Sequence, residues 1–439
     1  MRPFRRELAV IGSTLCLLSL IGCGGGGSSS SPPPVSVEPP APPVVVNQAP
    51  VFTSASTADM AENTTNAFYT IEVNDPDSTA SPSISLASSG DGQYFEIDSL
   101  TNTISARAGL DYELPADADG DNKYELNLQA SDADGATTSF AVTVTVTDIF
   151  DDLSFGLSPT AKPSENFDLA DWKLDTPFND AGGFETDTIQ AGVQDYEIDG
   201  YEHPTFFYTG PDGGLVMRSP VLGAKTSSGA RYTRTELREM LRRGDRSIST
   251  RGDNGAPNKN NWVFSSAPES VHAQAGGVDG RLRVTLAVNS VTTTGENFQI
   301  GRLIIGQIHA KDDEPIRLYY RKLPGNTHGS IYAQHEIAGG DDINFDMIGS
   351  VSSSQSNPVD GFMLGEIFTY EIVARGNFLD VTIIQGETVI AEQTIDMTDS
   401  GYDVTDDFMY FKAGVYHVND MADPEEFAQI TIYELENSH

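Results

Sequence analysis

Three short segments place side chains that bind anions or transfer protons at every second position. They are Arg234, Glu236 and Arg238 in "RTELREM", Gln307 and His309 in "GQIHA", and Tyr410, Lys412 and Tyr416 in "YFKAGVY". Residues i, i+2 and i+4 of a β-strand point to the same face of a sheet. If the three strands are neighbours, that face presents cations, an amide, an imidazole and phenols, which together suit a polyanionic ligand and proton transfer.

Each segment alone also has an ordinary structural interpretation. The Arg-Glu-Arg face fits a ladder of cross-strand ion pairs. A single histidine on a strand is often a structural residue, and a Tyr-Lys pair is common on amphipathic surfaces. The functional interpretation therefore depends on the three segments occurring together.

Composition and charge indicate a multi-domain β protein. The chain has 439 residues and a net charge of -38, a length that predicts two or three domains. Alternating segments such as "FAVTVTV" and "FLDVTII" predict strands, so the fold class is all-β. The excess of acid argues against nucleic acid as a partner. Of the 26 Lys and Arg, 21 follow residue 160, and seven of these lie between Arg231 and Arg251, which favours an anionic ligand there.

The N-terminal segment has the features of an export signal. A basic start and a short apolar run predict a signal peptide at residues 1–22. Its end, "LIGC", resembles a bacterial lipobox, which implies cleavage before Cys23 and lipidation of that residue. Gly24 then implies an exported outer-membrane lipoprotein of a Gram-negative bacterium, with the lipid as its only membrane contact. The alternative is a plain signal with an incidental cysteine. Residues 23–47, rich in Gly, Ser and Pro, predict a tether.

Residues 48–152 alternate predicted strands with acidic turns such as "NDPDS", "DADGDN" and "SDADG". Clustered carboxylates repel one another unless a cation such as Ca²⁺ neutralises them. The stretch resembles a bacterial cadherin-like β-sandwich, and the resemblance implies possible calcium ligands at Glu62, Asp111, Glu113 and Asp132. The closing "DIFDD" departs from the family's "DxNDN". The alternative is an acidic β-sandwich without metal.

The three opening segments, in their order, resemble the alginate lyases of polysaccharide lyase family 7. The resemblance covers residues 160–439 and includes the segment "FDLADWKLDTP" at its start. It implies an antiparallel β-jelly-roll sandwich that cleaves 4-linked uronate chains by β-elimination without a cofactor. His417 and Val418 depart from the family's pattern after Tyr416, which leaves nearby substrate contacts open.

The resemblance also implies a role for each residue. Arg234, Gln307 and His309 would donate to the uronate carboxylate as charge develops on it. Tyr416 would protonate the leaving oxygen and take the C5 proton of mannuronate, and His309 would take that of guluronate. The cations of Arg234 and Lys412 are expected to lower the pKa of the Tyr416 phenol. The remaining predicted substrate-binding residues are Glu236, Arg238, Tyr410 and Lys412. "QIH" favours guluronate-containing blocks, and we expect endolytic cleavage.

Three other functions compete with this prediction. A jelly-roll glycoside hydrolase needs carboxylates about 5–10 Å apart, often as Glu-x-Asp-x-Glu, and no such stretch occurs. A polysaccharide-binding lectin would need the arginines but has no evident use for His309 and Tyr416. An adhesin would act through the cadherin-like region. No His-Glu-x-x-His or paired CxxC motif indicates a catalytic metal.

Overall fold

The computed structural model describes residues 46–117, 119–149, 155–179, 187–193, 197–252 and 255–439. Cys23 and the signal segment lie outside these residues, so lipidation and export stay predictions. Within the described part of the chain, no helix has the length and apolar character needed to span a bilayer.

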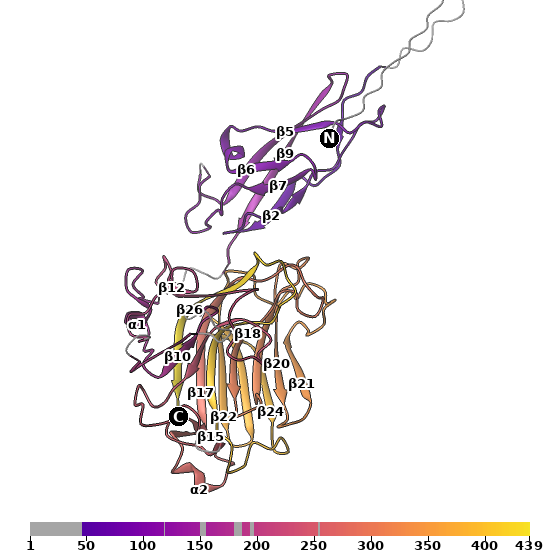
Figure 1. The fold of residues 1–439 in the computed structure, drawn as a ribbon. Coiled ribbons are helices and arrows are strands. Elements are labelled where there is room, and N and C mark those ends of the chain that lie inside the picture. Colours follow the sequence, from indigo (N-terminus) through magenta and orange to yellow (C-terminus); the bar gives the residue numbers. More distant parts are fainter. Residues whose placement is uncertain (1–45, 118, 150–154, 180–186, 194–196, 253–254) are drawn as a thin grey trace, which may run out of the picture. The chain divides into compact units, whose positions relative to one another are not determined.

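The N-terminal domain is a small β-sandwich (Figure 1). Its four-stranded sheet has the order β2 (Thr57–Ala61), β9 (Thr137–Thr147), β8 (Lys123–Ser131) and β5 (Ser83–Leu86). Its three-stranded sheet has the order β3 (Tyr69–Thr70), β7 (Thr103–Ala106) and β6 (Phe95–Asp98), preceded by the 3₁₀ helix η1 (Gly90–Tyr94). A short pair joins β1 (Val51–Phe52) to β4 (Val73–Asn74). Every second residue of β8 from Tyr124 to Ala130 is buried, which is the pattern of a strand with one face on a core.

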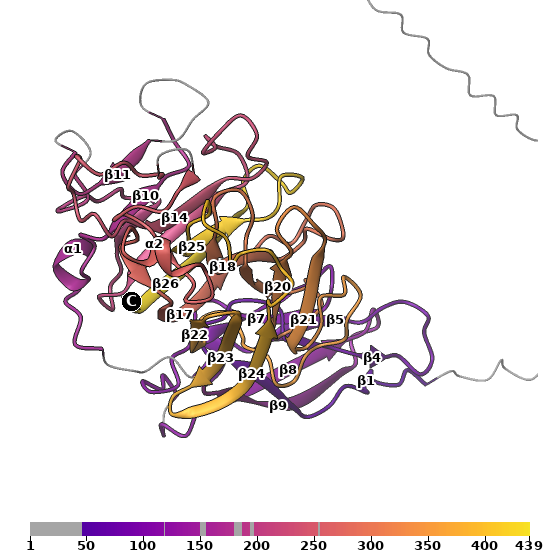
Figure 2. The ribbon, with the colours of Figure 1, turned by 90° about the horizontal axis from the view of Figure 1, so that it is seen from below.

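The C-terminal domain packs two large antiparallel sheets face to face, as the predicted jelly-roll class requires (Figure 2). The first sheet has the order β11 (Thr188–Gln190), β10 (Trp172–Asp175), β14 (Arg234–Glu239), β25 (Tyr410–His417), β18 (Arg302–His309), β19 (Ile316–Arg321), β20 (Ser330–Glu336) and β21 (Asp342–Ile348). The second has the order β12 (Phe207–Thr209), β13 (Leu215–Pro220), β26 (Phe427–Ser438), β17 (Gly280–Ser290), β22 (Ile367–Arg375), β23 (Phe378–Gln385) and β24 (Thr388–Asp396).

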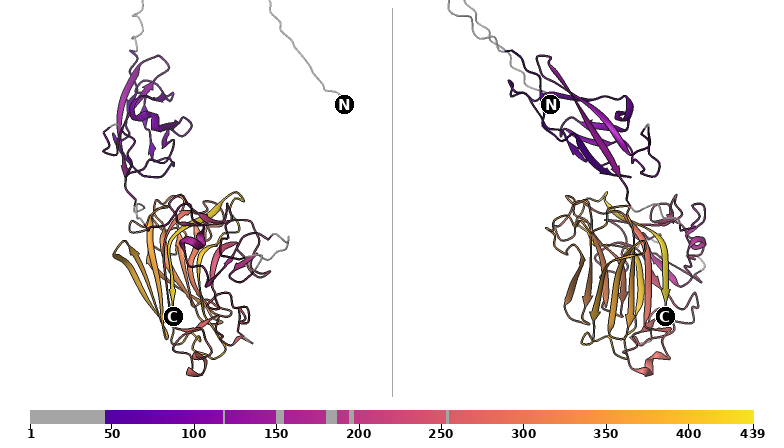
Figure 3. Two further views of the ribbon diagram at one scale, coloured as in Figure 1. Left: turned by 90° about the vertical axis from the view of Figure 1, so that its left-hand side faces the viewer. Right: turned by 180° about the vertical axis from the view of Figure 1, so that it is seen from behind.

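Smaller elements lie outside the two large sheets, whose long strands are seen side by side in Figure 3. They are α1 (Pro163–Asn166), α2 (Glu269–His272) and the parallel pair β15 (Trp262–Val263) and β16 (Gly277–Val278). The core between the sheets is apolar because each strand turns alternate residues inward. Leu237 of β14, Ile308 of β18 and Phe411 of β25 all belong to it.

Gly414 lets β25 pass close to β14. Its φ of 136° lies in the region that favours glycine. A Cβ at this position would come within 2.7 Å of the Thr235 carbonyl oxygen and 2.8 Å of the Met217 methyl group. Glycine is therefore required between the flanking functional residues of this strand.

A buried carboxylate on the core side of β14 ties several elements together. Glu239 Oε2 accepts hydrogen bonds from Trp262 Nε1 at 3.0 Å and from the Phe411 backbone N–H at 3.1 Å. Its Oε1 accepts from Asn437 Nδ2 at 2.6 Å and lies 2.9 Å from His439 Nε2. Burial disfavours the charged imidazole of His439, but the Glu239 charge outweighs it and raises the His439 pKa. The pair is therefore an ion pair at mildly acidic pH.

We predict that His439→Gln lowers the free energy of unfolding by about 1–3 kcal/mol, because Glu239 loses a charged partner. The folded-state pKa of His439 is raised, so its contribution is complete below the unfolded pKa of about 6.5 and is lost as pH rises through the folded pKa. Denaturant melts of both proteins across this pH range test the prediction. An unfolding difference that does not shrink with rising pH would contradict it.

Candidate active site

The structure places the three opening segments on three adjacent strands. β25 lies between β14 and β18 in the first sheet. Tyr416 pairs with Arg234 across one side of β25, and Lys412 pairs with Arg238 on that side and with Gln307 on the other. Six of the eight residues line a groove of about 810 Å³: Arg234, Arg238, His309, Tyr410, Lys412 and Tyr416.

The other two, Glu236 and Gln307, lie beneath the groove as buried residues. Glu236, 1% exposed, accepts a hydrogen bond from Arg234 Nη1 at 2.9 Å. It also forms an ion pair with Lys412 and accepts a hydrogen bond from the Gln307 amide. One buried carboxylate therefore holds a donor from each of the three strands.

Lys412 is an unusual cation because it is almost fully buried. Burial, and then repulsion from Arg234, lower its pKa to about 8 in spite of the favourable charge of Glu236. Lys412 is thus positively charged at neutral pH but close to its titration range.

The Tyr416 phenol lies against the guanidinium of Arg234, whose Cζ is 3.8 Å from the ring centroid. We expected the neighbouring cations to lower its pKa. The pKa is instead raised, because burial of the phenol outweighs the charge of Arg234. At neutral pH Tyr416 therefore holds a proton that it can donate.

His309 presents an unprotonated ring nitrogen. Its Nδ1 lies 2.6 Å from the Ala310 carbonyl oxygen, which can only accept, so the ring proton is on Nδ1. Burial and then the Lys412 charge hold the pKa of His309 well below its usual value. The ring stacks on Tyr410, with centroids 5.0 Å apart, which fixes its plane. Nε2 can therefore act as a proton acceptor.

Sequence reasoning missed two groups of groove residues. Lys173 and Asp175 come from β10, which pairs with β14, and they form an ion pair of 2.7 Å. Their alternation in "WKLD" was a usable signal. Glu314, in the loop between β18 and β19, also lines the groove. Nothing in the sequence pattern indicated that it lies there.

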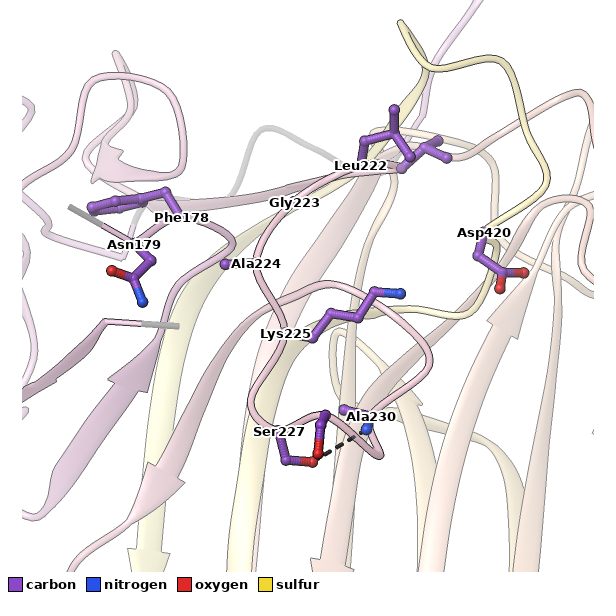
Figure 4. A pocket seen from close by; sticks show the side chains of 11 residues that line it. Phe178, Asn179, Leu222, Gly223, Ala224, Lys225, Ser227, Ala230 and Asp420 are labelled. Carbon is purple, nitrogen blue, oxygen red and sulfur yellow. Dashed lines mark hydrogen bonds between the residues drawn. The ribbon is translucent and has the colours of Figure 1, made fainter. Parts of the chain in front are cut away.

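A second hollow of about 880 Å³ adjoins the groove and shares Ser227 and Ala230 with it. Figure 4 shows the Lys225 side chain pointing in the direction of Asp420. Asp420 is itself held by Arg231 at 2.9 Å. This hollow offers room for substrate beyond the groove.

The acidic residues of the N-terminal domain fall into separate places. Carboxylate oxygens of Glu62 and Glu113 lie within 4.8 Å of each other and of Asp148, which the sequence analysis did not include. These oxygens suit Ca²⁺. Asp111, in the same loop as Glu113, accepts a hydrogen bond from the Leu114 N–H at 2.9 Å.

Asp132 belongs to the turn that precedes β9, whereas Asp148 follows that strand. The strand spans 11 residues, or roughly 35 Å at about 3.3 Å per residue. The Asp132 side chain accepts a hydrogen bond from the Ala136 N–H at 2.8 Å. The structure therefore separates Asp132 from the other three predicted ligands.

Comparison with known proteins assigns the C-terminal domain to the polysaccharide lyases. Residues 167–439 match the family model described as alginate lyase, and the chain belongs to this family. An alginate lyase of Klebsiella pneumoniae is 46% identical over 286 residues, which are 63% of this chain and 91% of that protein. The crystal structure of the alginate lyase from Klebsiella pneumoniae matches with a TM-score of 0.60 and 44% identity, covering 64% of this chain and 99% of that one. Residues 56–147 match the cadherin domain model.

We predict that Glu236→Gln lowers kcat/KM by about 10²–10³-fold, a loss typical of disturbed charge stabilisation. The neutral amide removes the carboxylate that pairs with Arg234 and Lys412 and releases both cations from fixed positions. Steady-state kinetics with alginate, with circular dichroism to confirm folding, test this. Glu387→Gln, an exposed carboxylate in the turn between β23 and β24, is the matched control. A folded Glu236→Gln protein with the control's activity would refute the role of Glu236.

Proposed function

We propose that the groove cleaves alginate by β-elimination, endolytically and with a preference for guluronate-containing blocks. The observation that carries the proposal is that one groove holds a neutral imidazole acceptor, His309 Nε2, and a protonated phenol, Tyr416. The same groove is lined by the cations of Arg234, Arg238 and Lys412. The family's relatives described as alginate lyases support the choice of polymer.

The reaction needs stabilisation of negative charge before a bond to carbon can break. The C5 proton of a uronate lies next to an ionised carboxylate and is a very weak acid. Arg234 donates to this carboxylate while its charge increases, which lowers the barrier. The amide nitrogen of Gln307 carries two hydrogens. It donates one to Glu236 and offers the other to the uronate carboxylate.

Two groups then move the protons. For guluronate, His309 Nε2 takes the C5 proton, the electron pair forms the C4–C5 double bond, and the C4–oxygen bond breaks. Tyr416 gives its proton to the departing oxygen. For mannuronate, the ionised form of Tyr416 takes the C5 proton and then gives that proton to the departing oxygen. Arg238, Tyr410 and Lys412 bind the neighbouring uronates.

The test is an ultraviolet assay of the full chain with polyguluronate, polymannuronate, mixed-block alginate and pectate, together with viscometry. We expect new C4–C5 double bonds with the alginate substrates, fastest with guluronate-containing ones, and an early drop in viscosity that indicates internal cleavage. New reducing ends without double bonds would indicate a hydrolase. Binding without either signal would indicate a lectin.

We further propose that Glu62, Glu113 and Asp148 bind Ca²⁺ and that lipidated Cys23 anchors the protein in the outer membrane. The three clustered carboxylates support the first statement, and the "LIGC" segment supports the second. Calorimetric titration of Ca²⁺ into the Glu113→Gln protein should show weaker binding than into the wild type. Cys23→Ser should move the protein from the membrane to the soluble fraction. Unchanged titration or unchanged fractionation would contradict the respective proposal.

A further inference from the structure

A carboxyl group beside His309 has no part in the reaction as described so far. Glu314 Oε1 lies 3.3 Å from His309 Nε2. The hydrogen on Nδ1 is directed at the Ala310 carbonyl, so Nε2 meets Glu314 with a lone pair. Two lone-pair atoms at this distance repel unless one of them carries a proton. The protonation state of Glu314 therefore affects the lone pair of His309 Nε2, the atom that must accept the C5 proton.

The surroundings of Glu314 leave its negative charge only partly compensated. Arg317 Nη1 lies 3.7 Å from its Oε2, but Arg317 also pairs with Glu336 at 3.1 Å and with Asp342. Burial, and then the neighbouring Glu336, raise the pKa of Glu314 to about 7. The charged or titratable groups that face the pair from the strands around it are Arg317 and Tyr319 (β19), Glu336 (β20), Asp342 (β21), Arg234 and Arg238 (β14), and Tyr410, Lys412 and Tyr416 (β25).

We propose that Glu314 is a positioning residue that controls whether His309 Nε2 is free to accept a proton, and so makes guluronate cleavage depend on pH. The inference rests on the proposed function. When protonated, Glu314 directs its O–H at Nε2 and occupies the lone pair. When ionised, it leaves the lone pair free and stabilises the imidazolium that forms after C5–H cleavage.

The proton balance of a turnover follows from this arrangement. The C5–H bond breaks, and a N–H bond forms at Nε2. The imidazolium passes this proton to the Glu314 carboxylate, and the resulting acid releases it to water. Tyr416, having protonated the leaving oxygen, regains a proton from water. His309 and Glu314 thus return to a free lone pair and a carboxylate.

Cleavage of polyguluronate should become faster as pH rises, because Glu314 is an acid that must be ionised. Glu314 loses its proton as pH rises through its pKa of about 7, so cleavage of polyguluronate rises over the same range in the free enzyme. Mannuronate cleavage uses the ionised form of Tyr416 as base, and the raised pKa of Tyr416 places its titration well above this range. The mannuronate rate therefore has no break near pH 7.

The kinetic test uses Glu314→Gln in the full chain. Its amide keeps the shape and always presents an N–H to Nε2. We expect kcat/KM on polyguluronate to fall by about 10²-fold, the lower range for general base catalysis. We also expect the acidic limb of its pH profile, the loss of kcat/KM as Glu314 becomes protonated, to disappear. KM and the rate on polymannuronate change little. Glu314→Asp should restore part of the limb, and Glu392→Gln, exposed on β24, is the control. An acidic limb that persists in Glu314→Gln would overturn the proposal.

A second readout does not depend on lyase activity. In protein with ¹⁵N-labelled histidine, the His309 ring signals of the wild type should shift with a midpoint near pH 7, the pKa of Glu314. This step should be absent in Glu314→Gln, while the Nδ1–H tautomer is kept. The same titration in both proteins would refute the coupling even if the enzyme proved to cleave alginate. Loss of the step in a protein without lyase activity would support the coupling and refute the proposed function alone.

Discussion

The groove depends on one buried carboxylate, that of Glu236. Arg234 and Lys412 are buried cations on neighbouring strands and repel each other, and repulsion from Arg234 is one reason for the lowered pKa of Lys412. Glu236 lies between them and pairs with both. A buried charge that loses its partner destabilises a protein by about 3–5 kcal/mol. The same contacts that position the cations for a polyanion therefore also bind β14 to β25 and, through Gln307, to β18.

The two faces of β14 have different roles: one serves the groove, and the other packs in the core. The outward face carries Arg234, Glu236 and Arg238 toward the groove, while Leu237 and Glu239 point into the sandwich. Glu239 binds donors from the core side, so both faces of this short strand are fixed by a carboxylate. This rigidity holds the guanidinium of Arg234 on the Tyr416 ring and sets the distances that proton transfer needs.

The sequence predicted the face of each strand better than the arrangement of the strands. Period-2 alternation was sufficient to group Arg234, Glu236 and Arg238, because it is a local property of the backbone. It does not specify neighbours, and β25 lies between β14 and β18 although it follows both in the chain. The resemblance of the motifs supplied that adjacency. The burial of side chains was also not predicted. Gln307 lies under the groove, and burial raises the pKa of Tyr416 although the charge of Arg234 by itself would lower it. Glu314 and Asp148 reach their sites from loops, for which no periodic pattern exists.

The measurement that tests the account most directly compares the rate of double-bond formation by the wild type, His309→Ala and Tyr416→Phe on polyguluronate and polymannuronate. If one groove holds a phenol acid and a separate imidazole base, Tyr416→Phe loses activity on both polymers. His309→Ala loses far more on polyguluronate than on polymannuronate, with both variants folded. Full activity of either variant on polyguluronate would contradict the assignment of the two proton-transferring groups.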